Sequence, residues 1–520
     1  MKSMKQKMLP ITGIAFFAVL TWSTVASAQS WSTLTTPPQF NPGNALLLTD
    51  GTVLVQQIQS FGWWKLTPQL HTIDYQNGTL TQVQSMPTTL NYDPTFFASA
   101  VLPDDRVIIE GGEYNNGFKK FTTKGAIYDP VANTWTSVPP PAGWKKIGDA
   151  SSVVLPDGTF MLANCCDNPP QAALLDATTL TWTVLTNLSG FVGKFDENNE
   201  EGWTLLPNGD VLTVDAYWNV FDLKGTNSEI YNPTSGVWTF AGKTGVQLWD
   251  SDDDGCSGGA GTHETGTGVL LPDGRVFATG SNSCPGLPGH TSIYDPTAGT
   301  WTPGPDFLAG NDQADAPAAL LPNGNVLVDT NTGVNNYPTT FYTFNGTKFL
   351  TIPQPKGLST LDSTEGARML ILPSGQILLT QWGQPQMWFF TPGGTYEAAW
   401  QPTISTYPAN VYENCTYTIT GTQFNGLSQG AYYGDDAQSA TNYPLVLFTN
   451  TGTGHQFFAR THGFSTMAVA TGAANVSTMF DVLPLGFEAG NGTMIVIANG
   501  IPSKPVGITL YQGGADHGPC

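Results

Sequence analysis

Five acidic residues recur at one position of a repeated pattern, eight or nine residues before a turn. They are Asp149, Glu200, Glu264, Asp315 and Glu365. Glu201 and His263 stand beside two of them. Carboxylate oxygens suit Ca²⁺, Mg²⁺ or Mn²⁺, and one histidine with two or three carboxylates also suits a transition metal. Paired carboxylates can instead act as general acid and base on a glycosidic bond, and their separation decides between these chemistries.

A solvated acidic rim is the alternative interpretation of these residues. The chain has 40 acidic and 19 basic residues, so several acids would fall near any repeated position. Exposed acids are also the default in proteins. The pattern therefore predicts a binding site, for a divalent metal such as calcium or for sugar hydroxyls. The alternative is a solvated acidic surface without a ligand.

A second acidic group occupies a single segment. Asp250, Asp252 and Asp254 precede Gly255 in the order Asp-x-Asp-x-Asp-Gly, which is how an EF-hand calcium loop begins. An EF-hand also needs a bidentate glutamate at position 12, where this chain has Gly261. The segment predicts a looser calcium loop or an acidic solvated loop.

The first residues of the chain indicate export. Three lysines precede an apolar stretch over residues 8–20 and a small-residue site, Ala26-Ser27-Ala28. This pattern predicts a secretory signal over residues 1–28 and a periplasmic or extracellular protein. Its removal changes the net charge from −21 to −24. Such a charge argues against nucleic acid or an anionic membrane as partner, and no later stretch is apolar enough for membrane insertion.

Export determines how the cysteines are interpreted, because an oxidising compartment favours disulfides. The six are Cys165, Cys166, Cys256, Cys284, Cys415 and Cys520. Their spacing suggests Cys256 with Cys284 around one hairpin, Cys415 with Cys520, and a bond within the vicinal pair, although six cysteines allow 15 pairings. A vicinal disulfide could offer a stiff apolar ring to a sugar face. A simple turn staple, or two separate thiols, is the alternative.

A hairpin signal recurs seven times and sets the fold. Copies such as Leu155-Pro156-Asp157-Gly158 join two apolar runs by an Asp-Gly or Asn-Gly turn, which predicts a hairpin with a type I′ turn. Successive turns are 50 to 54 residues apart, close to the kelch period of about 50, except for one step of 65 that locates an insertion near residues 241–262.

An aromatic signature lies between the hairpins. Tyr128-Asp129-Pro130 followed by Trp135 has copies at Tyr231 to Trp238 and Tyr294 to Trp301. Each unit therefore offers four strands, and seven such units predict an all-β, seven-bladed kelch-type propeller over residues 29–400. A β-solenoid lacks this spacing. Trp31-Ser32-Thr33-Leu34 looks like an outer strand placed before the first hairpin, so we expect it to complete the last blade.

The kelch signatures stop near Trp400. Residues 401–520 contain short alternating strands, such as Leu445-Val446-Leu447-Phe448, separated by Gly and Asn turns. Such strands fit a small β-sandwich of immunoglobulin-like, early-set type. We expect a domain boundary at Pro402.

This architecture resembles the galactose oxidase and glyoxal oxidase family over essentially the whole chain after residue 28. The run from Phe458 to Thr466 is similar to the last domain of that family. The resemblance implies an axial copper ion held by two tyrosines and two histidines, with one tyrosine cross-linked to a cysteine, in a centre that oxidises alcohols or aldehydes.

Most of those ligands are replaced in this chain. When the pattern of the family is aligned with this chain by matching the hairpin turns, the position of the cross-linking cysteine falls on Phe96 and that of the cross-linked tyrosine on Asp149. The position of a Tyr-His pair of copper ligands falls on Glu365-Gly366. The tryptophan that stacks on the radical falls near Cys166. The loop histidine alone has a match, at His462. The resemblance thus argues against copper and predicts that the copper-radical oxidase reaction is lost.

Two functions follow from these observations. The first is an exported, monomeric binding or scaffold protein whose axial pocket recognises a carbohydrate or protein ligand. The second is a secreted oxidase-like or metal-dependent enzyme that uses the axial carboxylates with His462. The remaining histidines are isolated in the sequence and are interpreted as turn or surface residues: His71, His290, His455 and His517.

Overall fold

The computed structural model of the chain describes residues 29–166, 171–185, 194, 197–216, 225–250, 262–282, 287–433 and 439–513. The described chain is all-β, with four short 3-10 turns: η1 (Thr88–Leu90), η2 (Leu308–Gly310), η3 (Thr364–Gly366) and η4 (Ala398–Trp400). The predicted signal over residues 1–28 lies outside these residues. Among the described helices, none is long and apolar enough to cross a membrane.

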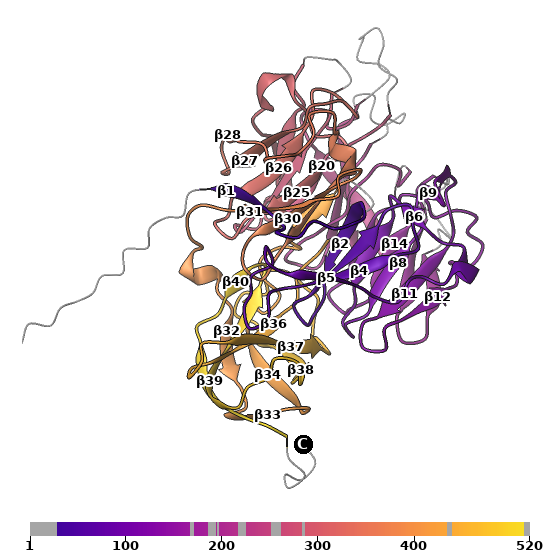
Figure 1. Cartoon of the computed structure of the whole chain (residues 1–520). Coiled ribbons are helices and arrows are strands. Elements are labelled where there is room, and N and C mark those ends of the chain that lie inside the picture. Colours follow the sequence, from indigo (N-terminus) through magenta and orange to yellow (C-terminus); the bar gives the residue numbers. More distant parts are fainter. Residues whose placement is uncertain are drawn as a thin grey trace, which may run out of the picture.

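Seven antiparallel four-strand units, here numbered as blades 1 to 7, make up the described part before Trp400 (Figure 1). Blade 1 consists of β2 (Pro42–Leu47), β3 (Val53–Gln57), β4 (Trp63–Thr67) and β5 (Thr79–Gln82). Blade 2 consists of β7 (Ala98–Val101), β8 (Val107–Glu110), β11 (Gly125–Asp129) and β12 (Thr134–Val138). Blade 3 consists of β13 (Ser152–Val154), β14 (Phe160–Ala163), β15 (Ala172–Asp176) and β16 (Thr181–Leu185). A short sheet beside blade 2 contains β6 (Pro94–Thr95), β9 (Tyr114–Asn115) and β10 (Phe118–Lys119).

Blades 4 to 7 continue the same pattern. Blade 4 consists of β17 (Thr204–Leu205), β18 (Val211–Val214), β19 (Asn227–Asn232) and β20 (Val237–Lys243), and blade 5 of β21 (Gly268–Leu270), β22 (Val276–Thr279), β23 (Thr291–Asp295) and β24 (Thr300–Pro303). Blade 6 consists of β25 (Pro317–Leu320), β26 (Val326–Thr330), β27 (Thr340–Phe344) and β28 (Phe349–Ile352). Blade 7 consists of β29 (Ala367–Ile371), β30 (Ile377–Gln381), β31 (Met387–Thr391) and the N-terminal strand β1 (Ser30–Thr33). The first strands of neighbouring blades contact one another, as β2 does with β7 and β29, so these strands line the propeller axis.

The N-terminal strand closes the ring, as the sequence predicts. β1 pairs antiparallel with β31, so that Trp31 lies opposite Phe390. The Trp31 ring also lies 5.2 Å from the ring of Phe341 in blade 6. The strand thereby joins the two ends of the propeller without a covalent bond.

The hairpin turns differ from the predicted type I′ geometry. In blade 3 the amide of Gly158 donates to the carbonyl of Leu155 (2.8 Å), and Gly158 has φ of 90°. A type I′ turn needs φ > 0 at both central residues, which Pro156 cannot adopt because its ring fixes φ near −65°. The loop is a three-residue type I turn followed by a left-handed glycine.

Aromatic pairs hold the outer strands of several blades. Tyr128 lies opposite Trp135 with ring centroids 5.0 Å apart, and the pair of Tyr294 and Trp301 repeats this contact at 5.1 Å. Tilted aromatic pairs of this kind stabilise the fold by more than the burial of their apolar surface alone would. The kelch signature is therefore the packing contact between the third and fourth strands of a blade.

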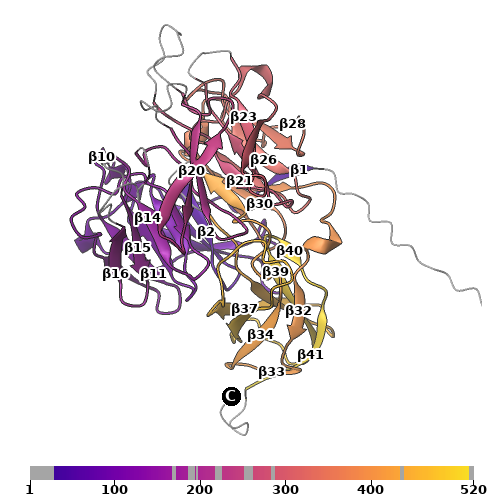
Figure 2. The ribbon, with the colours of Figure 1, turned by 180° about the vertical axis from the view of Figure 1, so that it is seen from behind.

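The C-terminal strands form a separate sheet path beside the propeller (Figure 2). In order they are β32 (Thr403–Thr406), β34 (Thr416–Thr422), β38 (Val476–Asp481), β37 (Gln456–His462), β36 (Leu445–Asn450), β39 (Gly490–Ala498), β41 (Val506–Tyr511) and β33 (Asn410–Tyr412), with β40 (Ile501–Pro502) paired to β39. They enclose their own apolar core around Phe448 and Phe480. The immunoglobulin-like assignment of this sheet stays a prediction.

One strand from the C-terminal part enters the propeller. β35 (Ala431–Tyr433) pairs with β25, so that Tyr433 lies opposite Pro317 at the start of blade 6. Further along, the Ser439 hydroxyl donates to the carbonyl of Ala45 in blade 1 (3.1 Å). This inserted segment therefore contacts the axial strands of two blades.

Candidate functional site

Three of the five predicted carboxylates converge at one end of the axis. We call this end, where the first strand of each blade begins, the entry face. Glu200, Glu264 and Asp315 precede the first strands of blades 4, 5 and 6, and each offers a carboxylate oxygen within 4.8 Å of the others. Glu264 is buried, and the other two are half-buried. Their common position before the blades brings together residues that are far apart in the sequence.

Hydrogen bonds between the blades fix this carboxylate trio. The Thr265 hydroxyl donates to the carbonyl of Glu200 (2.8 Å), and the amide of Asp315 donates to the carbonyl of Thr265 (3.1 Å). Thr265 therefore ties the entry segments of three consecutive blades to one another. These bonds fix the backbone of the segments that carry the three carboxylates.

The backbone at these positions is left-handed. Glu200 has φ of 59°, Asp315 has 45°, and His263, directly before Glu264, has 69°. Phe96 and Gly148 repeat this conformation in blades 2 and 3, with φ of 53° and 74°. A non-glycine residue with positive φ is uncommon, and this conformation costs about 1–3 kcal/mol.

Asp250 has a positioning role in this arrangement. It is buried, and its carboxylate accepts hydrogen bonds from the amides of Thr262 (2.7 Å) and Glu264 (2.6 Å). Burial raises the pKa of this carboxyl above its usual range. Asp250 thus holds the chain that leads into Glu264. The other predicted calcium-loop residues, Asp252 and Asp254, lie outside the described residues.

Two neighbours of the trio have other partners. The Nδ1 atom of His263 faces the carbonyl of Ala216 (3.1 Å), and its ring stacks on Trp249. Glu201 is fully buried, with its carboxylate 2.7 Å from the Lys194 ammonium, which also lies 3.2 Å from Glu229. The prediction that Glu201 lines the axial pocket is wrong, because this carboxylate is part of a buried ion-pair network.

Asp149 lies beside the cysteine pair. Cys165 and Cys166 are joined by a disulfide directly after β14, and a carboxylate oxygen of Asp149 is within 4.8 Å of both sulfur atoms. A side chain at Gly148 would place its Cβ 2.4 Å from Cys165 Sγ, so this position needs a glycine. Cys415 is also disulfide-bonded, whereas Cys256, Cys284 and Cys520 lie outside the described residues.

Glu365 faces an arginine that the sequence analysis missed. Tyr433 donates its hydroxyl proton to the carbonyl of Glu365 (2.9 Å), and the guanidinium of Arg368 lies 3.5 Å from the centre of the Tyr433 ring and 5.5 Å from that of Phe96. Burial raises the pKa of the Glu365 carboxyl, and Arg368 partly offsets this increase. Phe96, Glu365, Arg368 and Trp382 line one pocket.

A signal for this part of the site does exist in the sequence. Gly430-Ala431-Tyr432-Tyr433 is a β-rich run followed by Gly434-Asp435-Asp436, which is the pattern of a hairpin. Its pairing with an axial strand of the propeller depends on a contact across more than a hundred residues, so local spacing could not reveal it.

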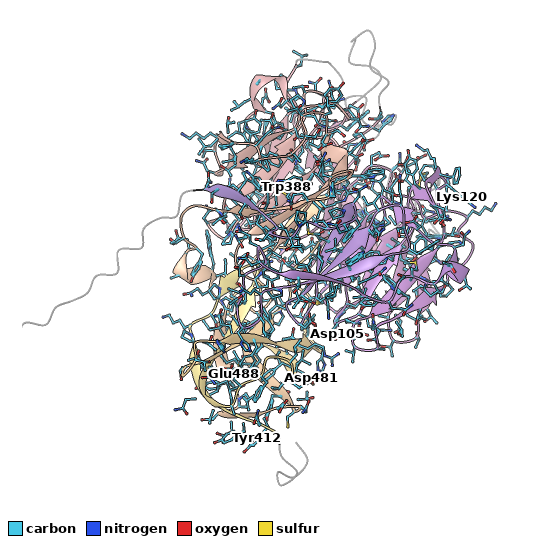
Figure 3. All side chains as sticks on the ribbon, in the orientation of Figure 1. Asp105, Lys120, Trp388, Tyr412, Asp481 and Glu488 are labelled. Atoms are coloured by element: carbon cyan, nitrogen blue, oxygen red, sulfur yellow. A yellow bond between two sulfur atoms is a disulfide. The ribbon has the colours of Figure 1, made fainter. Side chains whose placement is uncertain are left out.

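His462 lies at the opposite end of the propeller from the entry face, and its prediction as an axial residue is wrong. Its Nε2 atom is 3.3 Å from Asp481 Oδ1, and the amide of the next residue, Gly463, donates to the carbonyl of Pro103 in the blade 2 hairpin turn. Asp105 of the same turn pairs with Arg460. Figure 3 labels Asp105 and Asp481, which lie where the propeller meets the C-terminal sheet. The hairpin turns stand at the other end of the first strands, so His462 cannot face the carboxylate trio.

Comparisons with known proteins support the propeller fold. No family model matches the chain. Over 135 residues it is 27% identical to the kelch-like protein terF of Aspergillus terreus, a match that covers 25% of this chain and 25% of that relative. A solved fungal alcohol oxidase of the AA5 family, in complex with copper, superposes with a TM-score of 0.50 at 14% identity and covers 94% of this chain and 100% of that one. The chain has a kelch propeller of the galactose oxidase-like fold.

A further solved structure is similar at lower score. The extracellular domain of BT4673 from B. thetaiotaomicron has a TM-score of 0.44 and 10% identity, and the match covers 94% of this chain and 59% of that one.

Proposed function

We propose that this chain is an exported binding protein that holds a calcium ion at Glu200, Glu264 and Asp315 and, through it, a hydroxyl-rich ligand such as a carbohydrate. The observation that carries the proposal is the convergence of these carboxylates from three consecutive blades at the entry face.

The spacing of the trio agrees with calcium coordination. Calcium takes six to eight oxygen ligands at 2.3–2.6 Å, so two oxygens on one ion are at most about 5 Å apart. The carboxylate oxygens here lie within 4.8 Å of one another. Three carboxylates leave several coordination positions, which water or the hydroxyls of a ligand can fill.

The rest of the entry face offers surfaces for such a ligand. Phe96 and Trp382 are 5.9 Å apart, and Tyr114 lies beside Phe96. Aromatic faces pack against apolar surfaces of ligands, and nearby carboxylates such as Asp149 accept hydrogen bonds from hydroxyl groups. The planes of these rings are inclined by 66° and 55°, and aromatic side chains beside acceptor oxygens favour a sugar over an apolar ligand.

We also propose that the copper-radical reaction of the fold family is absent. At the positions of the ligands, Phe96 has no thiol, Asp149 and Glu365 have no phenol, and Gly366 has no imidazole. His462, which the resemblance assigns to the loop histidine, lies among the hairpin turns. These donors do not fit the copper centre. Release of hydrogen peroxide by the copper-loaded protein with galactose or an aldehyde would contradict this part of the proposal.

Calorimetric titration of the purified, chelator-treated protein with CaCl₂ tests the calcium site. We expect one bound ion per chain and an affinity at least tenfold lower in the variant Glu264→Gln/Asp315→Asn, because two of the three anionic ligands become neutral. Glu397→Gln, a change at an exposed acid away from the trio, is the matched control. Equal calcium affinity in the two variants would refute the site.

A glycan array probed with and without calcium tests the ligand. Glycan binding that disappears with EGTA supports the full proposal. Calcium binding without any glycan binding would retain the metal site and favour a protein ligand.

A further inference from the structure

A second group of possible metal ligands lies away from the entry face, where blade 1 meets the C-terminal sheet. His71 belongs to the loop between β4 and β5, His455 to the turn between β36 and β37, and Glu488 to the loop before β39. We propose that these three residues form a binding site for a divalent transition metal ion such as Zn²⁺.

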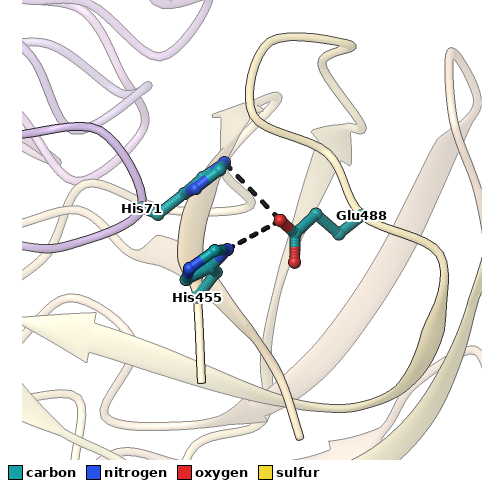
Figure 4. Close-up of side chains that lie close together, drawn as sticks. All are labelled: His71, His455 and Glu488. Carbon is teal, nitrogen blue, oxygen red and sulfur yellow. Dashed lines mark hydrogen bonds and ion pairs between the residues drawn. The ribbon is translucent and has the colours of Figure 1, made fainter. Parts of the chain in front are cut away.

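The three side chains already face one another (Figure 4). Glu488 Oε1 lies 2.7 Å from His455 Nδ1 and 3.9 Å from His71 Nε2, and all three ligand atoms are within 4.8 Å of one another. The imidazole rings stack with centroids 4.2 Å apart and an angle of 19° between their planes. Both histidines therefore direct a ring nitrogen at the same carboxylate oxygen.

This donor set selects for a transition metal. Two imidazoles and one carboxylate are a common three-ligand set for zinc, with a fourth position left for water. Calcium prefers oxygen ligands alone, so the entry-face trio and this cluster should take different ions. Tetrahedral bonds of about 2.1 Å place ligand atoms about 3.4 Å apart, and small rotations of these partly exposed side chains reach that spacing. The side chains are 24%, 43% and 25% exposed, which leaves a path for the ion.

Contacts around the cluster hold the ligands in place. The Thr453 hydroxyl donates to Glu488 Oε2 (2.6 Å), and the amide of Gln456 donates to the carbonyl of His71 (2.9 Å). Asn450 links the turn that carries His455 to the backbone at Glu488, because its side chain accepts from the amide of Gly452 and donates to the carbonyl of Ala489. Such outer contacts orient metal ligands and raise affinity.

The consequence is a metal clamp between two parts of the chain. His71 comes from the propeller, and the other two ligands come from strand connections of the C-terminal sheet. An ion that binds only when both parts are folded and in contact stabilises that state. The interpretation of His71 and His455 as isolated surface residues is therefore incomplete, because the fold brings them together.

Titration of the untagged, EDTA-treated full chain with ZnCl₂ tests the clamp. We expect stoichiometric binding and a rise of a few degrees in the thermal midpoint. His71→Ala/His455→Ala should bind zinc at this site at least 100-fold more weakly and lose that rise. His290→Ala, at an exposed histidine that pairs with Asp306, should behave as the unsubstituted protein.

Two further variants keep the result decisive. Glu488→Gln preserves the shape of the side chain and should reduce affinity about tenfold even if the double histidine variant misfolds. Unchanged zinc affinity in Glu488→Gln, or zinc binding that is lost only in Glu264→Gln/Asp315→Asn, would overturn the clamp. The second outcome would assign the zinc to the entry face, and the calcium titration tests that site independently.

Discussion

Single residues at the start of the blades determine what the propeller presents at its axis. Sequence spacing predicted that Glu200, Glu264 and Asp315 occupy equivalent positions, and the structure places them together. Spacing could not show that Glu201, one residue further along, turns into the blade toward Lys194. Glu200 has a left-handed backbone, so the direction of the next side chain does not follow from the alternation of an extended strand.

Asp312 offers a test of how burial affects an acid near this face. It is 1% exposed, and burial raises the pKa of its carboxyl to about 7. The pKa of Asp312 in the folded state lies above the usual 3.8, so the folded state binds the proton more tightly than the unfolded state does. The protonated carboxyl therefore adds to the free energy of unfolding at low pH, and this contribution is lost as the pH rises toward 7.

We expect Asp312→Asn to remove this dependence. Between pH 5 and pH 8, the free energy of unfolding of the unsubstituted protein should fall relative to that of the variant by roughly 2–3 kcal/mol. Urea unfolding of both proteins at the two pH values measures this difference. A constant difference would show that Asp312 titrates in its ordinary range.

At the scale of strands, the repeat was predictable and the long-range pairings were not. Hairpin spacing and the pair of Tyr128 and Trp135 are local, so the sequence indicated the blades and the closing role of Trp31. The insertion of β35 beside β25, and the packing of β37 on the hairpin turns, join segments more than a hundred residues apart. The match of His462 to a loop motif was therefore misleading, since motif similarity alone did not fix which end of the propeller it faces.

The closing strand gives a prediction at this scale. Trp31 packs on Phe341 and Phe390, so Trp31→Ala should lower the free energy of unfolding by about 2 kcal/mol, below the cost for a fully buried tryptophan. Urea unfolding followed by circular dichroism measures the change. Val131→Ala, at a residue 62% exposed, is the control and should change stability by less than about 0.5 kcal/mol. A similar small effect of Trp31→Ala would mean that β1 does not close the ring in solution.

At the scale of the whole molecule, the C-terminal sheet is fastened to the propeller at several points. Tyr443 donates its hydroxyl proton to the carbonyl of Leu47, Gln429 accepts from the amide of Leu205, and Met467 donates to Pro156. These contacts reach blades 1, 3 and 4, in addition to the strand pair in blade 6. Two parts joined through so many blades should unfold together.

The distribution of tryptophan allows this coupling to be measured. All 15 tryptophans precede residue 401, and all except Trp22 of the predicted signal lie within residues 29–400, so the fluorescence of those 14 reports on the propeller and not on the C-terminal strands. Phe448 is fully buried in the C-terminal core against Phe457 and Phe480, and Phe448→Ala should destabilise that core by about 3–4 kcal/mol. If the parts are coupled, the urea midpoint of tryptophan fluorescence shifts downward with that of circular dichroism, although the substitution lies outside the propeller.

Leu485→Ala, at a residue 74% exposed, should leave both midpoints unchanged. A fluorescence midpoint that stays fixed while circular dichroism shows an earlier transition would mean that the propeller is stable without its C-terminal partner, and that the inserted strand adds little to it.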